Sequence, residues 1–374
     1  MTALLMMLLS KFAALTTAAH LISVALVFRR VAAPRAAVPV HLPPLTVLRP
    51  VCGLDPTLAE TLETTFSDRS ADIEVIFCIA SAEDPAIGLV RRIMAQHPDV
   101  PSQLLIGEDP ISGNPKLNNL AKGWAAAQHD WIVMIDSNVA LPPSYIGTLF
   151  ATWRPGTGLV TSPPAGTHGS GLWAALEAAF LNTYQDRWQL AADELGTGFA
   201  QGKVLFWRRD ILENAGGVAA LGHDLAEDIA STRLVRQAGL KVRVVRHPFP
   251  QPLGHRKFRE VWQRQVRWAQ VRRAGFPALF ATEILSGALP PLAALCVSGA
   301  LPSVALILFL ALWYGAEWLL ARRAGWPAGP LDIVSWLVRD ALIPAIWLAS
   351  FTTRGIVWRG NQVRNAPETV AAGE

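Results

Sequence analysis

A carboxylate ends a segment that has the pattern of a buried strand. Asp136 follows the apolar run 131–135, and Ser137 and Asn138 come directly after it. Asp, Ser and Asn are residues that commonly form turns. However, a carboxylate and an amide oxygen in this position can also hold a divalent cation, which in turn neutralises a diphosphate. The buried strand before Asp136 favours a site over a simple turn.

Two further charged groups belong to the same predicted region. Asp84 follows a strand predicted over 73–80 and opens a helix, where it can act as an N-cap, bind a ligand, or do both. Lys116 begins a helix predicted over 116–128. The ammonium group and the free backbone N–H groups of a helix start can bind a phosphate there. The alternative is that Lys116 is an ordinary lysine on the solvated surface.

A later acidic pair is a candidate for acid–base chemistry. The helix predicted over 222–239 has Glu227 and Asp228 near its start. There they can complement the helix dipole, or one of them can serve as a general base. Because adjacent residues on a helix point about 100° apart, we expect only one of the two to face a site.

The helix predicted over 259–273 is basic and rich in aromatic residues. Arg264, Arg267 and Trp268 are spaced i, i+3 and i+4 and therefore share one face. Two guanidinium groups there can grip a diphosphate, and the indole can stack on a sugar. An interfacial helix with its arginines on lipid headgroups explains the pattern equally well, and both readings can hold together.

The elements that position these groups alternate between strand and helix. Strands are predicted at 45–51, 73–80, 102–107 and 131–135. Helices are predicted at 55–66, 84–97 and 116–128. The alternation predicts a parallel doubly wound sheet, in which ligands bind outside the carboxyl ends of the strands. Pro50, Ser81 to Asp84 and Asp136 are then expected to line one crevice.

Apolar stretches predict membrane segments at both ends of the chain. The 374 residues are 51% hydrophobic and only 17% charged, which is too apolar for an ordinary soluble enzyme. Residues 3–28 are long enough to cross a bilayer. A cleaved signal peptide is the alternative, but no clear small-residue cleavage site follows the apolar run. Further candidate spans are 284–299, 301–320 and 331–350, the last interrupted by an Arg-Asp pair.

Basic residues flank the candidate spans and predict their orientation. These residues are Arg29, Arg30, Arg35, Arg272, Arg273, Arg322 and Arg323. By the positive-inside rule they lie in the cytoplasm, which predicts a multi-pass protein of the cell (inner) membrane with a cytoplasmic middle domain. The net charge of +4 is too small to indicate nucleic acid as a partner, and basic flanks suit the bilayer's anionic headgroups better.

These patterns predict five regions along the chain. They are a transmembrane helix at 1–30, a cytoplasmic domain at 40–257, an interfacial helix at 258–280, a membrane region at 281–355 and a polar tail at 356–374.

Six short segments, taken in order, resemble a known family. They are "LRPVCGLDPTLAETLETTF", "EDPAI", "NPKLNNL", "IDSNV", "AGGVAALGHDLAED" and "RQVRW". The set resembles the ceramide glucosyltransferases, which are membrane-bound inverting enzymes with three separated aspartates and a (Q/R)xxRW motif. The resemblance covers about residues 40–275 and continues into the hydrophobic tail. It implies a nucleotide-sugar-binding (GT-A-like), doubly wound, mostly parallel sheet with transmembrane helices at both ends.

The resemblance also implies roles for individual residues. Asp84 and Asp136 match the family aspartates that serve the donor and a metal, and Asp228 matches the proposed catalytic base. A divalent cation (Mg²⁺ or Mn²⁺) is then expected on Asp136 and Asn138. Relatives often carry a carboxylate where Ser81 stands, and some carry Asp where Asn138 stands, which leaves the choice of metal open.

The implied reaction is transfer of a sugar, with glucose preferred, from a UDP-sugar to a hydroxyl of a membrane lipid, with ceramide preferred, and with inversion. The expected donor-binding residues are Pro50, Asp84, Lys116, Asn118 and Asp136. The motif residues Arg264, Arg267 and Trp268 are expected to assist catalysis. A hopanoid or another polar lipid is an alternative acceptor. A processive polysaccharide synthase, a non-enzymatic lipid-binding protein and a transporter fit the pattern less well.

Overall fold

The computed structural model describes residues 3–34, 37–299, 302–353, 356–358 and 361–363. The chain forms two compact units, which we call the helical unit and the sheet unit. The helical unit comprises Met1–Pro34, Ala165–Leu195 and Leu253–Arg354. The sheet unit comprises Arg35–Pro164, Gly196–Pro252 and Gly355–Glu374. The single domain predicted over 40–257 is therefore divided, and most of the predicted tail lies outside the described residues.

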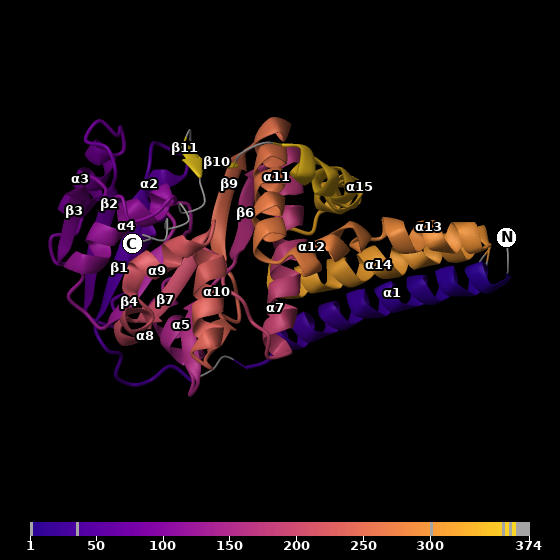
Figure 1. Cartoon of the computed structure of the whole chain (residues 1–374), viewed down its shortest axis with the longest axis horizontal. Coiled ribbons are helices and arrows are strands. Elements are labelled where there is room, and N and C mark those ends of the chain that lie inside the picture. The colour runs from indigo at the N-terminus through magenta and orange to yellow at the C-terminus, as the bar shows by residue number, and fades with distance from the viewer. Residues whose placement is uncertain (1–2, 35–36, 300–301, 354–355, 359–360, 364–374) are drawn as a thin grey trace, which may run out of the picture. The chain divides into compact units, whose positions relative to one another are not determined.

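The sheet unit is built on seven strands in the order β3-β2-β1-β4-β7-β5-β8 (Figure 1). The strands are β1 (Leu45–Val51), β2 (Ile73–Ile79), β3 (Ser102–Ile106), β4 (Trp131–Ile135), β5 (Thr157–Thr161), β7 (Val204–Arg208) and β8 (Lys241–Val244). The first four pair in parallel, as the sequence predicts, and β5 is parallel to β8. Only β7 is antiparallel to its neighbours, β4 and β5.

Helices cover both faces of this sheet. One face packs against α2 (Leu58–Glu63), α3 (Ile87–Gln96) and α5 (Tyr145–Thr152). The other packs against α4 (Pro115–Ala126), α8 (Arg209–Asn214), α9 (Gly217–Ala220) and α10 (Glu227–Gln237). Every residue of β1 and β2 is buried, as expected for parallel strands covered on both sides. The predicted α/β fold class is confirmed.

One predicted helix boundary is wrong. The helix predicted from residue 222 begins at Glu227, because Ala226 has an extended backbone and a 3-10 turn, η3 (Leu221–His223), comes before it. Another 3-10 turn, η1 (Thr64–Phe66), follows α2. Elsewhere, the predicted strands and helices agree with the structure to within a few residues.

The helical unit contains the apolar segments. Its helices are α1 (Ala3–Ala32), α6 (Leu172–Ala179), α7 (Arg187–Glu194), α11 (Phe258–Gly275), α12 (Pro277–Thr282), α13 (Leu289–Ser298), α14 (Ser303–Ala324) and α15 (Pro330–Thr352). The π-helical turn η2 (Phe180–Asp186) joins α6 to α7, and η4 (Glu283–Leu285) follows α12. Residues 165–195 belong here because Leu176 and Phe180 share a core with α11 and α15.

Two pairs of short strands complete the fold. β6 (Pro164–Ser170) pairs with β9 (Phe249–His255), and β10 (Ile356–Trp358) pairs with β11 (Asn361–Val363).

Three described helices are long and apolar enough to cross a bilayer, namely α1, α14 and α15. A fourth candidate is the pair Pro277–Leu285 and Leu289–Ser298, bent by 54°, where the sequence predicted one span over 284–299. Figure 1 shows α1, α13 and α14 running side by side, whereas α15 is seen nearly end-on. Helix α15 therefore runs across these three helices, and cannot cross a bilayer in the same direction as α1 and α14.

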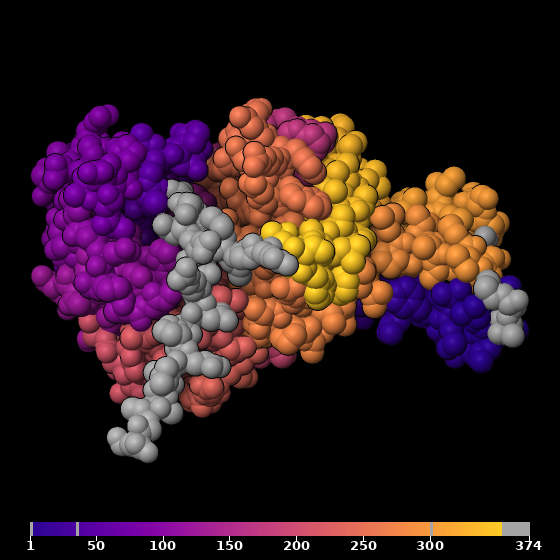
Figure 2. Space-filling model, turned by 45° about the horizontal axis from the view of Figure 1, so that its top comes forward, coloured from indigo at the N-terminus to yellow at the C-terminus, as the bar shows by residue number. Residues whose placement is uncertain are grey.

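The outer surface of α1, α13 and α14 is apolar. Figure 2 shows α1 in indigo beside the orange surface of α13 and α14. Exposed large apolar side chains along α1 and α14 include Leu4, Leu8, Leu15, Ile22, Ile307, Leu308, Leu312 and Leu319. The basic residues that end α1 (Arg29, Arg30) and α14 (Arg322, Arg323) lie at the same end of these helices (Figure 1). The predicted topology requires this common position, and the side of the membrane that it faces stays a prediction.

A buried ion cluster holds α14, α15 and η2 together. Arg339 lies 3.1 Å from Glu317 and 2.8 Å from Asp340, and it donates to the hydroxyl of Thr183 at 2.6 Å. Tyr314 donates to Asp340 at 2.9 Å. The charged side chains are about 1% exposed or less, so each depends on the others for compensation.

We expect Arg339→Met to lower the free energy of unfolding by roughly 3–5 kcal/mol, because it leaves buried carboxylates without their cation. The measurement is thermal unfolding of the full chain in detergent. The matched control is Arg323→Met at the exposed end of α14, for which we expect a change within about 0.5 kcal/mol. Equal effects of the two substitutions would contradict this role of the cluster.

Candidate functional site

The carboxylate of Asp136 lies between two lysines at the end of β4. Its Oδ1 is 2.6 Å from Lys116 Nζ, and its Oδ2 is 2.9 Å from Lys203 Nζ. Lys203 Nζ also donates to Asn138 Oδ1 at 3.0 Å. The backbone N–H of Asp136 donates to the carbonyl of Lys203 at 2.9 Å, so the backbone fixes Lys203 beside Asp136.

Lys116 is held in place by the start of α4. The side chain of Asn114 caps this helix by accepting from the Lys116 N–H, and Pro115 occupies the first turn. Lys116 Nζ lies 2.6 Å from Asp136, from Glu227 and from the carbonyl of Gly202. An ammonium has three N–H donors, and all three are used. The positive charge of Lys116 is therefore at the site, as predicted, but its ammonium group is bonded to protein acceptors.

The acidic pair of α10 divides into two roles. Glu227 accepts from Lys116 at 2.6 Å and from Asn114 at 2.9 Å, so both of its oxygens are engaged. Asp228 accepts from the backbone N–H of Gly202 at 3.0 Å and of Ile229 at 2.8 Å. Of the pair, only Asp228 has no cation on its carboxylate, which makes it the one suited to exchange a proton.

The charges at the site shift the pKa values in opposite directions. Burial disfavours the ionised form of Asp136, but the ammonium groups of Lys116 and Lys203 outweigh burial and hold its pKa far below its usual value. Burial, followed by the negative charge of Glu227, raises the pKa of Asp228 to about 7. The carboxyl group of Asp136 therefore stays ionised, whereas that of Asp228 can exchange a proton near neutral pH.

Three other predicted donor-binding residues have structural contacts. Asp84 accepts from the N–H of Gly53 at 2.8 Å and of Ala86 at 2.8 Å, so it ties the end of β1 to α3. Asn118 accepts from the N–H of Ser112 at 2.9 Å and thereby braces the loop before α4. Pro50 lies near the end of β1, which spans the predicted residues 45–51, and it is buried there. Their roles toward a ligand stay predictions.

The Arg-x-x-Arg-Trp motif lies on α11, in the helical unit. Arg264 forms an ion pair with Glu177 of α6, which is fully buried, and Arg256 lies 3.2 Å from the same carboxylate. Trp268 packs against the apolar cluster that includes Leu181. Arg264 and Trp268 thus share one face, as predicted, but the charge of Arg264 already has a protein partner.

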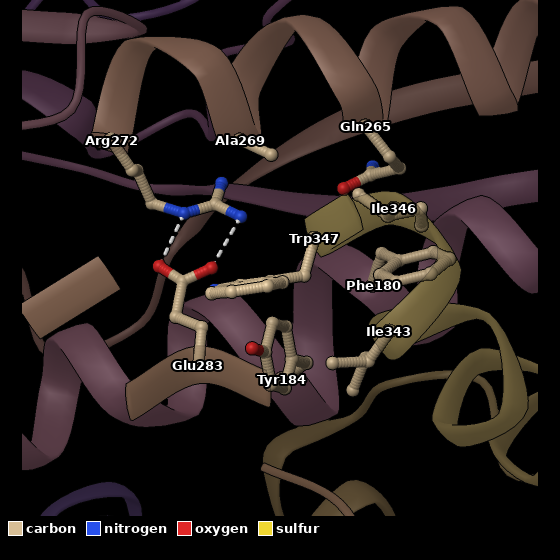
Figure 3. A pocket seen from close by; sticks show the side chains of 9 residues that line it. All are labelled: Phe180, Tyr184, Gln265, Ala269, Arg272, Glu283, Ile343, Ile346 and Trp347. Carbon is tan, nitrogen blue, oxygen red and sulfur yellow. Dashed lines mark hydrogen bonds and ion pairs between the residues drawn. The ribbon is translucent and has the colours of Figure 1, made fainter. Parts of the chain in front are cut away.

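Another face of α11 lines a small pocket within the helical unit (Figure 3). Its lining residues are Phe180, Tyr184, Gln265, Ala269, Arg272, Glu283, Ile343, Ile346 and Trp347. Arg272 and Glu283 form a bidentate ion pair at 2.7 and 2.9 Å. The open space is about 10 Å³, which suits a single water molecule. The pocket is therefore too small for a sugar or a lipid tail.

Sequence reasoning missed Lys203, Asn114 and Glu177. Lys203 stands before β7, and a parallel sheet would have put it at the opposite edge from Asp136. Because β7 is antiparallel to β4, its start meets the end of β4. The available signal was the single lysine in "QGKVLFW", directly before an apolar run. Asn114 had a clearer signal, because an asparagine directly before a proline is typical of a helix start.

Comparison with known proteins finds relatives over most of the chain. A family model described as Glycosyl transferase family 21 matches residues 8–371. Ceramide glucosyltransferase 1 of Caenorhabditis elegans is 27% identical over 334 residues, which cover 86% of this chain and 72% of that protein. The ceramide glucosyltransferase of Komagataella phaffii is 37% identical over 106 residues, which cover 27% of this chain and 21% of that protein.

A solved structure supports the fold. The mannosyltransferase PcManGT from Pyrobaculum calidifontis, in complex with GDP-Man and Mn²⁺, superimposes with a TM-score of 0.52 at 20% identity. The match covers 92% of this chain and 98% of that chain. At this identity the likeness concerns the fold alone, which is the GT-A-like arrangement that the sequence predicts.

We expect Lys116→Met to destabilise the protein by roughly 3 kcal/mol, because Glu227 and Asp136 would each lose a close cation in a mostly buried place. The measurement is the thermal unfolding midpoint, with Lys241→Met, at the exposed start of β8, as the matched control. An unchanged midpoint for Lys116→Met would show that the ion pairs do not stabilise the fold.

Proposed function

The chain belongs to glycosyltransferase family 21, and from this premise we propose that it transfers glucose from UDP-glucose to ceramide in a membrane. The observation that carries the proposal is the likeness to Ceramide glucosyltransferase 1 over 86% of this chain. The name of that relative supplies both the sugar and the acceptor. The partly buried acid–lysine site in the sheet unit supports a reaction on a charged donor.

Asp228 is the proposed general base. The hydroxyl oxygen of the lipid attacks C1 of the sugar, Asp228 takes the hydroxyl proton, and the bond between C1 and the departing UDP breaks. A single displacement of this kind inverts C1. A carboxyl group with a pKa of about 7 is partly ionised at neutral pH and can still hold the proton it receives. Glu227 is unsuited to this step because its carboxylate is paired with the ammonium of Lys116, whereas Asp228 accepts only from backbone N–H groups.

The donor is proposed to lie at the carboxyl edge of β1 and β4, the usual ligand position in a doubly wound sheet. This places its diphosphate beside the lysines around Asp136. We keep the prediction that Arg264, Arg267 and Trp268 assist the departing UDP, an electrostatic role aimed at charge that develops during transfer.

The predicted divalent cation meets an obstacle in this chain. Asp136 and Asn138 were its expected ligands, yet their oxygens accept hydrogen bonds from lysine ammonium groups. No group of three or more His, Cys, Asp or Glu side chains within the described ranges is arranged to hold a metal ion. The residues as arranged do not fit Mg²⁺ or Mn²⁺, and no step above depends on either ion.

The membrane context supports a lipid acceptor. We propose a multi-pass protein of the inner membrane with its site on the cytoplasmic face, because basic residues gather at one end of α1 and α14. This placement would let the site reach the headgroup of a lipid in the cytoplasmic leaflet.

The proposed function is tested by an acceptor screen with the purified full chain in vesicles. We expect label from UDP-[¹⁴C]glucose to appear in ceramide, and neither in a hopanoid nor in long polysaccharide. Labelling of a hopanoid alone would overturn the proposed acceptor, and labelling from UDP-galactose or UDP-GlcNAc alone would overturn the proposed sugar.

The matched variant for this screen is Asp228→Asn, which keeps the size of the side chain and removes its basicity. We expect roughly a 10²- to 10⁴-fold loss of transfer with UDP binding retained, as measured by calorimetry. Loss of UDP binding in this variant would contradict the assignment of Asp228 as the base.

We expect kcat/KM for transfer to fall as the pH is lowered through about 7. Below this pH the raised pKa keeps Asp228 protonated, and a protonated carboxyl group cannot take the lipid's proton. Glu227→Gln removes the adjacent negative charge that helps to raise this pKa, so the midpoint should move to lower pH. A rate that is constant from about pH 5.5 to 8.5 in the wild type would contradict this account.

A further inference from the structure

Lys203 is held by groups that fix both its backbone and its ammonium. It is the residue before β7, and the antiparallel pairing of β7 with β4 places it next to Asp136. Its Nζ lies 2.9 Å from Asp136 Oδ2 and 3.0 Å from Asn138 Oδ1. Its side chain is 16% exposed, so this is neither a freely moving surface lysine nor a completely buried one.

The two lysines at Asp136 differ in how many of their donors are used. Lys116 uses three N–H groups on three protein acceptors, one of them the carboxylate of Glu227. Lys203 uses two, and within the described part of the chain it has no third acceptor. Lys203 therefore keeps one N–H and a partly solvent-accessible charge for a ligand, whereas Lys116 is fully engaged by the protein.

The ammonium of Lys203 and a divalent cation compete for the same oxygens. Mg²⁺ and Ca²⁺ bind oxygens at about 2.0–2.6 Å, and the two oxygens expected to bind an ion here each accept from Lys203. The other oxygen of Asp136 is bonded to Lys116. An ion could enter only by displacing an ammonium, against the repulsion of the remaining positive charge.

We propose that the ammonium of Lys203 takes the place of a divalent cation in this enzyme and binds the diphosphate of the sugar donor directly. The inference rests on the proposed function, because it takes the diphosphate to lie at the end of β4. Transfer then needs no added metal ion.

The step balances without a further reactant. The lipid oxygen forms the new bond to C1 as the bond between C1 and the phosphate oxygen breaks. The proton of the lipid hydroxyl goes to Asp228, and UDP leaves with the electron pair of the broken bond. The fixed charge of Lys203 stabilises the negative charge that develops on the leaving phosphate oxygen.

The test titrates UDP into the full-length protein in detergent, in EDTA and in Mn²⁺, with transfer activity measured in parallel. For the wild type we expect UDP affinities within about threefold of each other in the two conditions. Lys203→Met should lose roughly 10- to 100-fold of its UDP affinity in EDTA, the range for a lost hydrogen bond to a charged group. Mn²⁺ should recover part of this loss, because the substitution frees the oxygens of Asp136 and Asn138.

Two further variants serve as controls. Lys203→Arg keeps the charge and should bind UDP nearly as well as the wild type in EDTA. Lys241→Met removes an exposed lysine and should change nothing. If Lys203→Met does not fold, as judged by thermal unfolding, the wild-type and Lys203→Arg titrations still decide the question.

Several outcomes would overturn the inference. Wild-type protein that binds UDP only when Mn²⁺ is present would show that a metal ion, not Lys203, neutralises the diphosphate. Lys203→Met that binds UDP like the wild type in EDTA would remove Lys203 from the site. Wild-type protein that binds UDP in neither condition would overturn the proposed function itself, and this inference with it.

Discussion

The site of this protein depends on the need to compensate a carboxylate at the end of a buried strand. Asp136 closes β4 with a side chain that is only 22% exposed, so its partly desolvated charge requires close positive partners. Lys116 and Lys203 supply them from opposite sides. Each lysine is positioned by a different element, the start of α4 or the start of β7, and the carboxylate thereby joins parts of the chain that lie far apart in sequence.

This charge arrangement separates the two acids of α10. Glu227 balances the charge of Lys116 as part of the scaffold. Asp228, one residue later, receives only backbone N–H groups on its oxygens, and its neighbour's charge works against its ionisation. Because successive residues of a helix point about 100° apart, Glu227 faces Lys116 and Asp228 does not. Asp228 can therefore exchange a proton. A structural ion pair and a proton-accepting group come from adjacent residues.

The four parallel strands, their helices and the position of Asp136 at the end of a buried strand were predictable, because buried runs, helix starts and strand ends leave local patterns. The pattern alone left Glu227 and Asp228 as alternatives, and only the family resemblance singled out Asp228. What the sequence could not supply was the direction of β7. A strand carries no mark of whether its neighbour is parallel, and that direction decides whether Lys203 lies beside Asp136. The partner of Arg264 was hidden for a similar reason, since Glu177 lies far away in sequence inside an apolar helix.

The crossing of α15 over α1, α13 and α14 affects which parts of the protein are accessible from each side of a membrane. If α1 and α14 traverse the bilayer, α15 lies along it, and its apolar side chains rest in one leaflet. Of the described residues, only the first turns of α1 and the neighbourhood of the α13–α14 hairpin would then reach the far side. If the sheet unit lies on the cytoplasmic side, as proposed, a protease or an antibody applied to intact cells would find almost nothing to recognise, while the same reagents added to opened membranes would meet the whole sheet unit.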